Sequence, residues 1–195
     1  AREITVATKI GIPDPKQNPR LRNAIINARH ENMPNDKINK AIQKASSSED
    51  NNNFDEIRYE AIANNGISLI IETLTDNRNR TASEIRSILN KNGGTLAETG
   101  SSVFNFKKIA EIVYNLQHCS KDDFFDYAVE NAAEDVLENG DVIIATCKQE
   151  EFGKLRDALE KKFGEPMFAR LKWQPVNELS VEKNSLAKIL NIIDL

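Results

Sequence analysis

The sequence predicts an α+β protein of three domains, in which an N-terminal helical bundle precedes two α/β domains, one ferredoxin-like and inserted in the other. Apolar residues recur with a helical period in the first 45 residues, and strand and helix patterns alternate over residues 54–106. Residues 109–173 follow the order β-α-β-β-α-β, which is the ferredoxin-like plan. The predicted domains are residues 1–50, residues 54–107 with 176–195, and residues 108–175.

Three helices are expected in the first domain. Residues 4–11 show one face of a helix, Asn18 and Pro19 supply the cap and first position of a second, and Pro34 opens a third. The apolar stripes of the last two helices are Leu21, Ala24, Ile25 and Ala28, and Ile38, Ala41, Ile42 and Ala45. Residues 46–53 are polar and indicate a linker.

The middle domain is expected to begin with a hairpin. Two strand patterns, 54–63 and 67–75, flank the turn Asn64–Gly66, and the second is apolar on both faces, which favours a central strand. Thr81 and Glu84 form a capping box for a helix that Gly93 and Gly94 end. A third strand is expected at 103–106.

The last domain is predicted from strands at 109–116 and 167–173 and a hairpin at Asn139-Gly140. Its two helices carry the apolar residues Phe124, Phe125, Ala128 and Ala132, and Phe152, Leu155, Leu159 and Phe163. A final helix follows, with Leu186, Ile189, Leu190 and Ile193 as its stripe. This helix is expected to return to the middle domain, which makes the last domain an insertion.

The composition is that of a soluble globular protein, because 29 % of the 195 residues are charged and 39 % are hydrophobic. No apolar run approaches the roughly 18 residues that span a bilayer, and no signal-peptide pattern occurs, so no membrane partner is expected. The separated Cys119 and Cys147 fit free thiols in a reducing cytoplasm. Both ends look cut, and the chain is expected to be part of a longer one.

The charge is distributed unevenly along the chain, although its net value is only −4. Residues 1–45 contain nine Lys/Arg against four Asp/Glu, whereas residues 109–160 contain four against thirteen. This asymmetry indicates separate surfaces with separate partners, although surface charge also drifts by chance.

No enzymatic motif is found. The two histidines, His30 and His118, have no partners at metal-ligand spacing, and the sequence lacks GxSxG, GxGxxG and a phosphate-binding loop. The carboxylates of Asp122, Asp123 and Asp126 stand at a helix start, where they complement the helix dipole. The protein is therefore expected to be non-catalytic and to need no metal or cofactor.

A first candidate nucleic-acid site is the stretch 75–81, between a strand and a helix N-terminus. Free N–H groups there favour an anion, and Arg78 and Arg80 add fork-shaped donors that match a phosphate. The alternative is a capped turn whose arginines pair with Glu98 or Asp76.

The helical domain offers a second candidate, a basic surface of six side chains: Arg20, Arg22, Arg29, Lys37, Lys40 and Lys44. Such contacts to phosphates give affinity and salt dependence without sequence choice. The alternative is an ordinary solvated helix face. Trp173 beside Lys172 is a base-stacking candidate, but a core or rim position is the commoner role for such a residue.

Several runs of residues resemble the YebC/PmpR family closely. They are Asn18–Ile25, Asn32–Ile38, Leu74–Thr81, Arg86, Asn92–Gly94 and Gly100-Ser101. The similarity is strong over residues 1–106 and looser to Leu195. It implies a three-domain, cytoplasmic bacterial protein of a kind described as a DNA-binding transcriptional regulator. Some members, including a mitochondrial relative that activates translation of an oxidase subunit, are linked instead to the ribosome.

The chain also departs from the family pattern. A Lys/Arg-rich start with a Gly-His-Ser-Lys-Trp-like run is missing, the hairpin at Ala61–Gly66 has less glycine than usual, and a closing strand after the final helix is absent. The leading hypothesis is a DNA-binding transcriptional regulator, with a ribosome-associated factor that binds RNA as the alternative. The acidic residues 109–160 are expected to face a protein partner.

Overall fold

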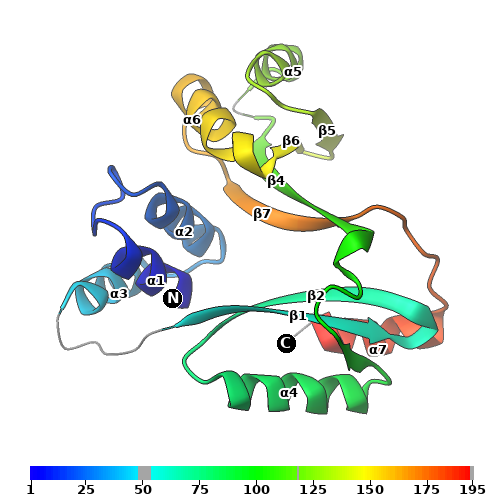
Figure 1. The fold of residues 1–195 in the computed structure, drawn as a ribbon. Helices are drawn as coiled ribbons and strands as arrows, with labels where there is room; N and C mark the ends of the chain where they lie inside the picture. The colour runs from blue at the N-terminus through cyan, green and yellow to red at the C-terminus, as the bar shows by residue number, and fades with distance from the viewer. Residues whose placement is uncertain (48–53, 118, 194–195) are drawn as a thin grey trace. The chain divides into compact units, whose positions relative to one another are not determined.

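The computed structural model describes residues 1–47, 54–117 and 119–193, so His118 and most of the expected linker at 46–53 lie outside the described residues (Figure 1). The chain divides into two compact units, formed by residues 1–51 with 108–172 and by residues 52–107 with 173–195. The described residues form a three-stranded and a four-stranded sheet together with helices, which confirms the predicted α+β class.

The N-terminal segment of the first unit is helical and consists of α1 (Arg2–Ile10), α2 (Pro19–His30) and α3 (Asn35–Ser46). Their shared core contains Ile4, Leu21, Ile25 and Ile38. Asn18 caps α2, since its side-chain oxygen accepts the Leu21 N–H at 3.0 Å. Its side-chain nitrogen donates to the Ala7 carbonyl at 2.7 Å. The buried side-chain amide of Asn18 therefore caps α2, as predicted, and it also joins α2 to α1.

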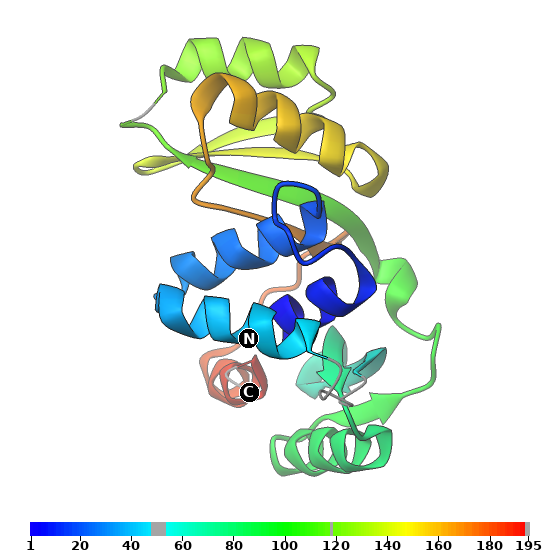
Figure 2. The same cartoon turned by 90° about the vertical axis from the view of Figure 1, so that its left-hand side faces the viewer.

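The rest of the first unit has the predicted β-α-β-β-α-β order. Its elements are β4 (Phe106–Asn115), α5 (Lys121–Glu130), β5 (Asp135–Asn139), β6 (Val142–Lys148), η3 (Gln149–Glu151), α6 (Phe152–Phe163) and β7 (Phe168–Pro175). The strand order β5-β6-β4-β7 is that of the ferredoxin-like fold. Both helices lie on one face of the sheet (Figure 2), where Phe124, Leu155 and Leu159 are fully buried.

The second unit is built on a three-stranded antiparallel sheet. Its elements are β1 (Asp55–Ala63), η1 (Asn64–Gly66), β2 (Ile67–Thr75), α4 (Arg78–Lys91), β3 (Thr95–Ala97), η2 (Val103–Asn105) and α7 (Lys183–Ile193). Ala61 and Ala63 of β1 share one core with Ile85 of α4 and with Ile189 and Ile192 of α7. The C-terminal helix therefore returns to the middle domain, as predicted.

Two predictions for this sheet are wrong. β2 is an edge strand rather than a central one, because β1 pairs with both β2 and β3. The apolar run of β2 reflects partial burial on both faces and not a central position. Residues 103–105 form the 3-10 turn η2, and the third strand is Thr95–Ala97. Three residues are too few to show the alternation that identifies a strand.

The boundaries and faces of two other helices also differ from the prediction. α5 ends at Glu130, and Ala132 lies beyond it with φ +79°, outside the helical region. Phe125 is 48 % exposed, so Phe124 and Ala128 provide the buried face. In α7 the expected stripe is largely exposed, and the buried residues are Ile189 and Ile192.

Candidate nucleic-acid interface

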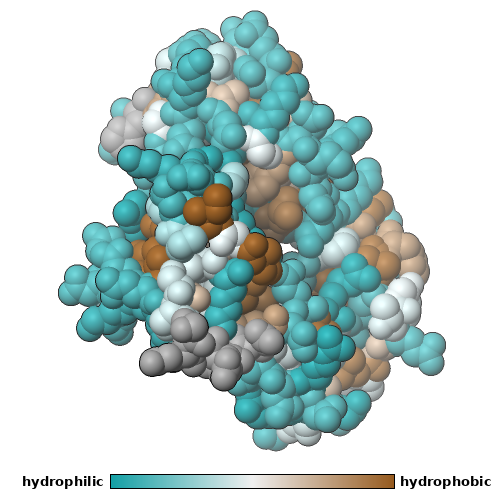
Figure 3. Space-filling view, turned by 60° about the vertical axis from the view of Figure 1, so that its left-hand side comes forward, coloured by the Kyte–Doolittle hydropathy of each residue, from teal (hydrophilic) through white to brown (hydrophobic). Residues whose placement is uncertain are grey.

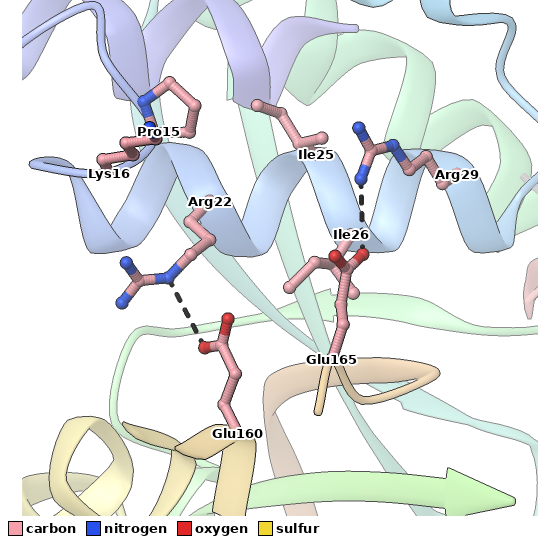
Figure 4. A pocket seen from close by; sticks show the side chains of 8 residues that line it. All are labelled: Pro15, Lys16, Arg22, Ile25, Ile26, Arg29, Glu160 and Glu165. Carbon is pink, nitrogen blue, oxygen red and sulfur yellow. Dashed lines mark hydrogen bonds and ion pairs between the residues drawn. The ribbon is translucent and has the colours of Figure 1, made fainter. Parts of the chain in front are cut away.

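The arginines of α2 are paired with carboxylates inside the first unit. Arg20 Nε donates to Glu3 Oε1 at 2.6 Å, with a second bond between the same groups at 3.1 Å. Figure 4 shows Arg22 and Arg29 on α2, each facing a carboxylate. Arg22 Nε lies 3.6 Å from Glu160 Oε2, and Arg29 Nη1 lies 3.3 Å from Glu165 Oε1. Half of the predicted basic surface is therefore neutralised locally.

Other polar groups on α2 are used in the same way. Arg22 Nη2 also lies 3.1 Å from Asp157 Oδ1. The Asn27 side chain donates to the Ala169 carbonyl at 3.0 Å and accepts the Ala169 N–H at 3.2 Å. Because these partners lie on α6 and β7, the polar side of α2 joins the helical segment to the ferredoxin-like segment.

The lysines of α3 have a different environment. Lys37, Lys40 and Lys44 are exposed. They lie on the side of the helix away from Ile38 and Ala45, which are buried. Within the described part of the chain, none of the three has a carboxylate partner. The face shown in Figure 3 is mostly hydrophilic, with apolar residues gathered in separate patches. Because Lys37, Lys40 and Lys44 are exposed and have no carboxylate partner in the described residues, they remain available to a phosphate.

Arg78 and Arg80 lie in the first turn of α4 rather than in a preceding loop. Asn77 Oδ1 accepts the Arg80 N–H at 3.0 Å, so Asn77 caps the helix. The predicted capping box at Thr81 is wrong, since the Thr81 hydroxyl bonds to Thr75 Oγ1 at 2.7 Å. The cap already occupies one of the N–H groups that an anion would bind.

Both of these arginines also have carboxylate partners. Arg78 Nε donates to Asp55 Oδ2 at 2.8 Å, and Arg80 pairs with Asp76. The hydrogen bond from Arg78 lowers the pKa of Asp55, and the same bond raises the pKa of Arg78. The pairing of Arg80 agrees with the alternative raised from the sequence, whereas Arg78 uses Asp55 rather than Glu98. Both side chains are more than half exposed.

Trp173 lies in the last part of β7, which belongs to the second unit, and it has an arginine neighbour. The Arg58 guanidinium carbon lies 5.4 Å from the centre of the indole ring, in a cation–π contact. The indole nitrogen is buried. This setting matches the structural role for Trp173 and leaves less of its ring for stacking on a base.

A cleft of about 550 Å³ lies within the helical segment, and the sequence analysis did not identify it. Its lining comes from the loop before α2, from α2 and from α3: Pro13, Pro15, Ile25, Arg29, Asn35, Ile38, Asn39, Ile42 and Gln43. A smaller cleft of about 310 Å³ shares Pro15, Ile25 and Arg29 with it and contains the ion pairs drawn in Figure 4. The available signal was the spacing of Asn35, Asn39 and Gln43, four residues apart.

The described residues contain no group of three or more His, Cys, Asp or Glu that is able to hold a metal ion. Burial raises the pKa of the Cys147 thiol to about 11 and also raises that of Cys119, so both thiols are protonated at neutral pH. In the same part of the chain, no helix is long and apolar enough to cross a membrane.

Comparisons with known proteins give two kinds of match. The family model described as TACO1/YebC protein N-terminal domain matches residues 1–48. The model described as TACO1/YebC second and third domain matches residues 54–195. A crystal structure of a conserved hypothetical protein, Aq1575 from Aquifex aeolicus, is 34 % identical in sequence, with a TM-score of 0.84 over 99 % of this chain and 80 % of that chain.

Proposed function

The chain belongs to the TACO1/YebC family, and we propose that it is a non-catalytic regulatory protein of the transcription-regulator type that binds DNA in the cytoplasm. The observation that carries the proposal is the row of exposed lysines on α3, Lys37, Lys40 and Lys44. Their charges have no carboxylate partner among the described residues, unlike those of the arginines on α2 and α4.

The physical argument rests on where positive charge is available. A phosphate backbone binds cations and releases its condensed counterions, so affinity depends on side chains that have no protein carboxylate to displace. Lys37, Lys40 and Lys44 recur at intervals of three and four residues, which places them along one side of α3. Such contacts position a protein on a duplex and do not read its sequence.

The acidic residues 109–160 would repel the same phosphates. Their four basic and thirteen acidic side chains give this stretch a strongly negative charge. We assign this stretch to a protein partner, and in this proposal it also orients the nucleic acid toward the helical segment.

Binding of duplex DNA at several salt concentrations tests the proposal. Replacing Lys37, Lys40 and Lys44 by alanine removes three phosphate contacts, so the slope of log affinity against log salt should fall by about 2.7. The matched control changes Lys161, Lys183 and Lys188, which are also exposed, and should leave the slope close to that of the unaltered protein.

Two outcomes contradict the proposal. An unchanged slope in the α3 variant removes this helix as the phosphate-binding surface. Saturable binding to ribosomes that depends on the same lysines, with only weak and sequence-blind binding to DNA, makes the protein a translation factor instead.

A further inference from the structure

The larger cleft in the helical segment combines an apolar floor with polar groups along one side. Ile25 and Ile38 are buried beneath it, and Ile42, Pro13 and Pro15 complete its apolar lining. Ile25 and Arg29 of α2, which also line the smaller cleft drawn in Figure 4, form one wall. Apolar side chains at the base of an open cleft favour a flat, weakly hydrated ring over a strongly hydrated ligand.

The second wall is a row of amides on α3. Asn35, Asn39 and Gln43 are four residues apart, so their side chains follow one another along the same side of the helix. Arg29 Nε donates to Asn35 Oδ1 at 3.4 Å, and in the described residues Asn39 and Gln43 have no side-chain partner. An amide offers a donor and an acceptor together, which is the pattern that pairs with the edge of a nucleobase.

The lysine row lies beside the amide row on the same helix. Lys40 and Gln43 are three residues apart on α3, so this amide has an exposed cation next to it on the helix surface. An apolar floor suits the face of a base, an amide suits its edge, and a lysine suits the phosphate that follows. The charge of Lys40 beside Gln43 is complementary to an anionic chain and disfavours a basic peptide.

We propose that this cleft binds an unpaired nucleobase of a single-stranded nucleic acid, with Asn39 and Gln43 at the base edge and Lys40 at the adjoining phosphate. A base inside an intact duplex is stacked and paired, so its face cannot reach the floor. The inference rests on the proposed nucleic-acid binding and adds to it a preference for unpaired segments.

The test compares two single-stranded oligonucleotides of equal length and charge, one with all four bases and one abasic, by fluorescence anisotropy with the full chain. The unaltered protein should bind the base-containing strand at least about fivefold more tightly, as one stacked or hydrogen-bonded base provides. The double change Asn39→Leu and Gln43→Leu should abolish that ratio while leaving the salt slope unchanged. Asn90→Leu, an exposed amide on α4, is the matched control.

The outcomes separate this inference from the proposed function. Equal binding of the two strands by the unaltered protein overturns the base site and leaves the cleft to another occupant, such as an extended peptide, while the lysine surface stands. If the double variant still binds the base-containing strand more tightly than the abasic strand, the assignment to this cleft is overturned. Failure to bind either strand or duplex DNA overturns both proposals. Circular dichroism checks that the variants keep their helices.

Discussion

Helices α2 and α3 are neighbours that each carry three basic side chains, yet the structure uses them in opposite ways. On α2 every arginine faces a carboxylate, and two of those arginines reach residues more than a hundred positions away in the chain. On α3 the lysines are exposed and lack such partners in the described residues. The same positive charge therefore serves internal contacts on one helix and remains available to an external anion on the next.

The comparison shows why counting charges overestimates a binding surface. An arginine fork matches a carboxylate as well as a phosphate, so a nearby Asp or Glu competes directly with a ligand. A lysine that already faces solvent binds a phosphate without first breaking a protein ion pair. The charges on α3 are therefore expected to dominate the salt dependence of binding.

Breaking the anchor of α2 should have the largest effect. Asn18→Ala removes the cap of α2 and the two bonds that the side-chain nitrogen donates to the carbonyls of Ala7 and Ile12. The free energy of unfolding should fall by about 2 kcal/mol. Urea denaturation followed by circular dichroism measures the loss, and Asn90→Ala on the exposed side of α4 serves as the control. A change under about 0.5 kcal/mol would show that α2 does not depend on this amide.

Releasing one arginine should convert part of α2 into a surface like that of α3. Glu165→Gln removes the carboxylate 3.3 Å from Arg29 Nη1 and leaves a neutral amide. DNA binding should gain about one phosphate contact, which steepens the salt slope by about 0.9 and strengthens binding several-fold at low salt. Glu178→Gln changes the net charge equally at an exposed position and should leave the slope unaltered. If both variants have the same salt slope, the ion pair with Glu165 is not what keeps Arg29 from binding a phosphate.

Removing a paired arginine should have little effect on binding. Arg22→Ala loses contacts with Asp157 and Glu160, and its side chain is 26 % exposed. We expect the free energy of unfolding to fall by about 0.5 kcal/mol, as for other partly exposed ion pairs. The salt slope for DNA should stay that of the unaltered protein. A slope reduced by about one unit would place Arg22 in the interface and remove the contrast between the helices.

Much of the fold could be predicted because its helices have a clear apolar period and its turns carry Asn-Gly or Gly-Gly. Where the prediction was wrong, the sequence offered two equivalent signals or too few residues. Asn77 and Thr81 both fit a helix cap, and the side chain of Asn77 decides the start of α4. Thr95–Ala97 is too short to show a strand period, although it pairs with β1 in the sheet.

The candidate site was harder to predict than the fold. The sequence shows that Arg22 and Arg29 are basic, but their partners lie on α6 and after it, and only the folded chain brings them within reach. The cleft depends likewise on Pro13, Ile25 and Ile38 meeting from three segments. Residue type and spacing therefore identify which side chains carry charge, while tertiary contacts decide which of them are available.

The smallest expected effect concerns the arginine–carboxylate pair at the start of α4. The hydrogen bond from Arg78 is the largest cause of the lowered pKa of Asp55, so Arg78→Ala should return that pKa to the ordinary value of an aspartate. Because a lowered pKa stabilises the fold above the unfolded-state pKa and loses this effect as pH falls through the folded-state pKa, the change should weaken stability at neutral pH and leave it unaltered at strongly acidic pH. An NMR titration of the Asp55 carboxyl measures the shift directly. An Asp55 pKa that stays low in the variant would mean that Arg78 does not hold this carboxylate and is, like the lysines of α3, available to a phosphate.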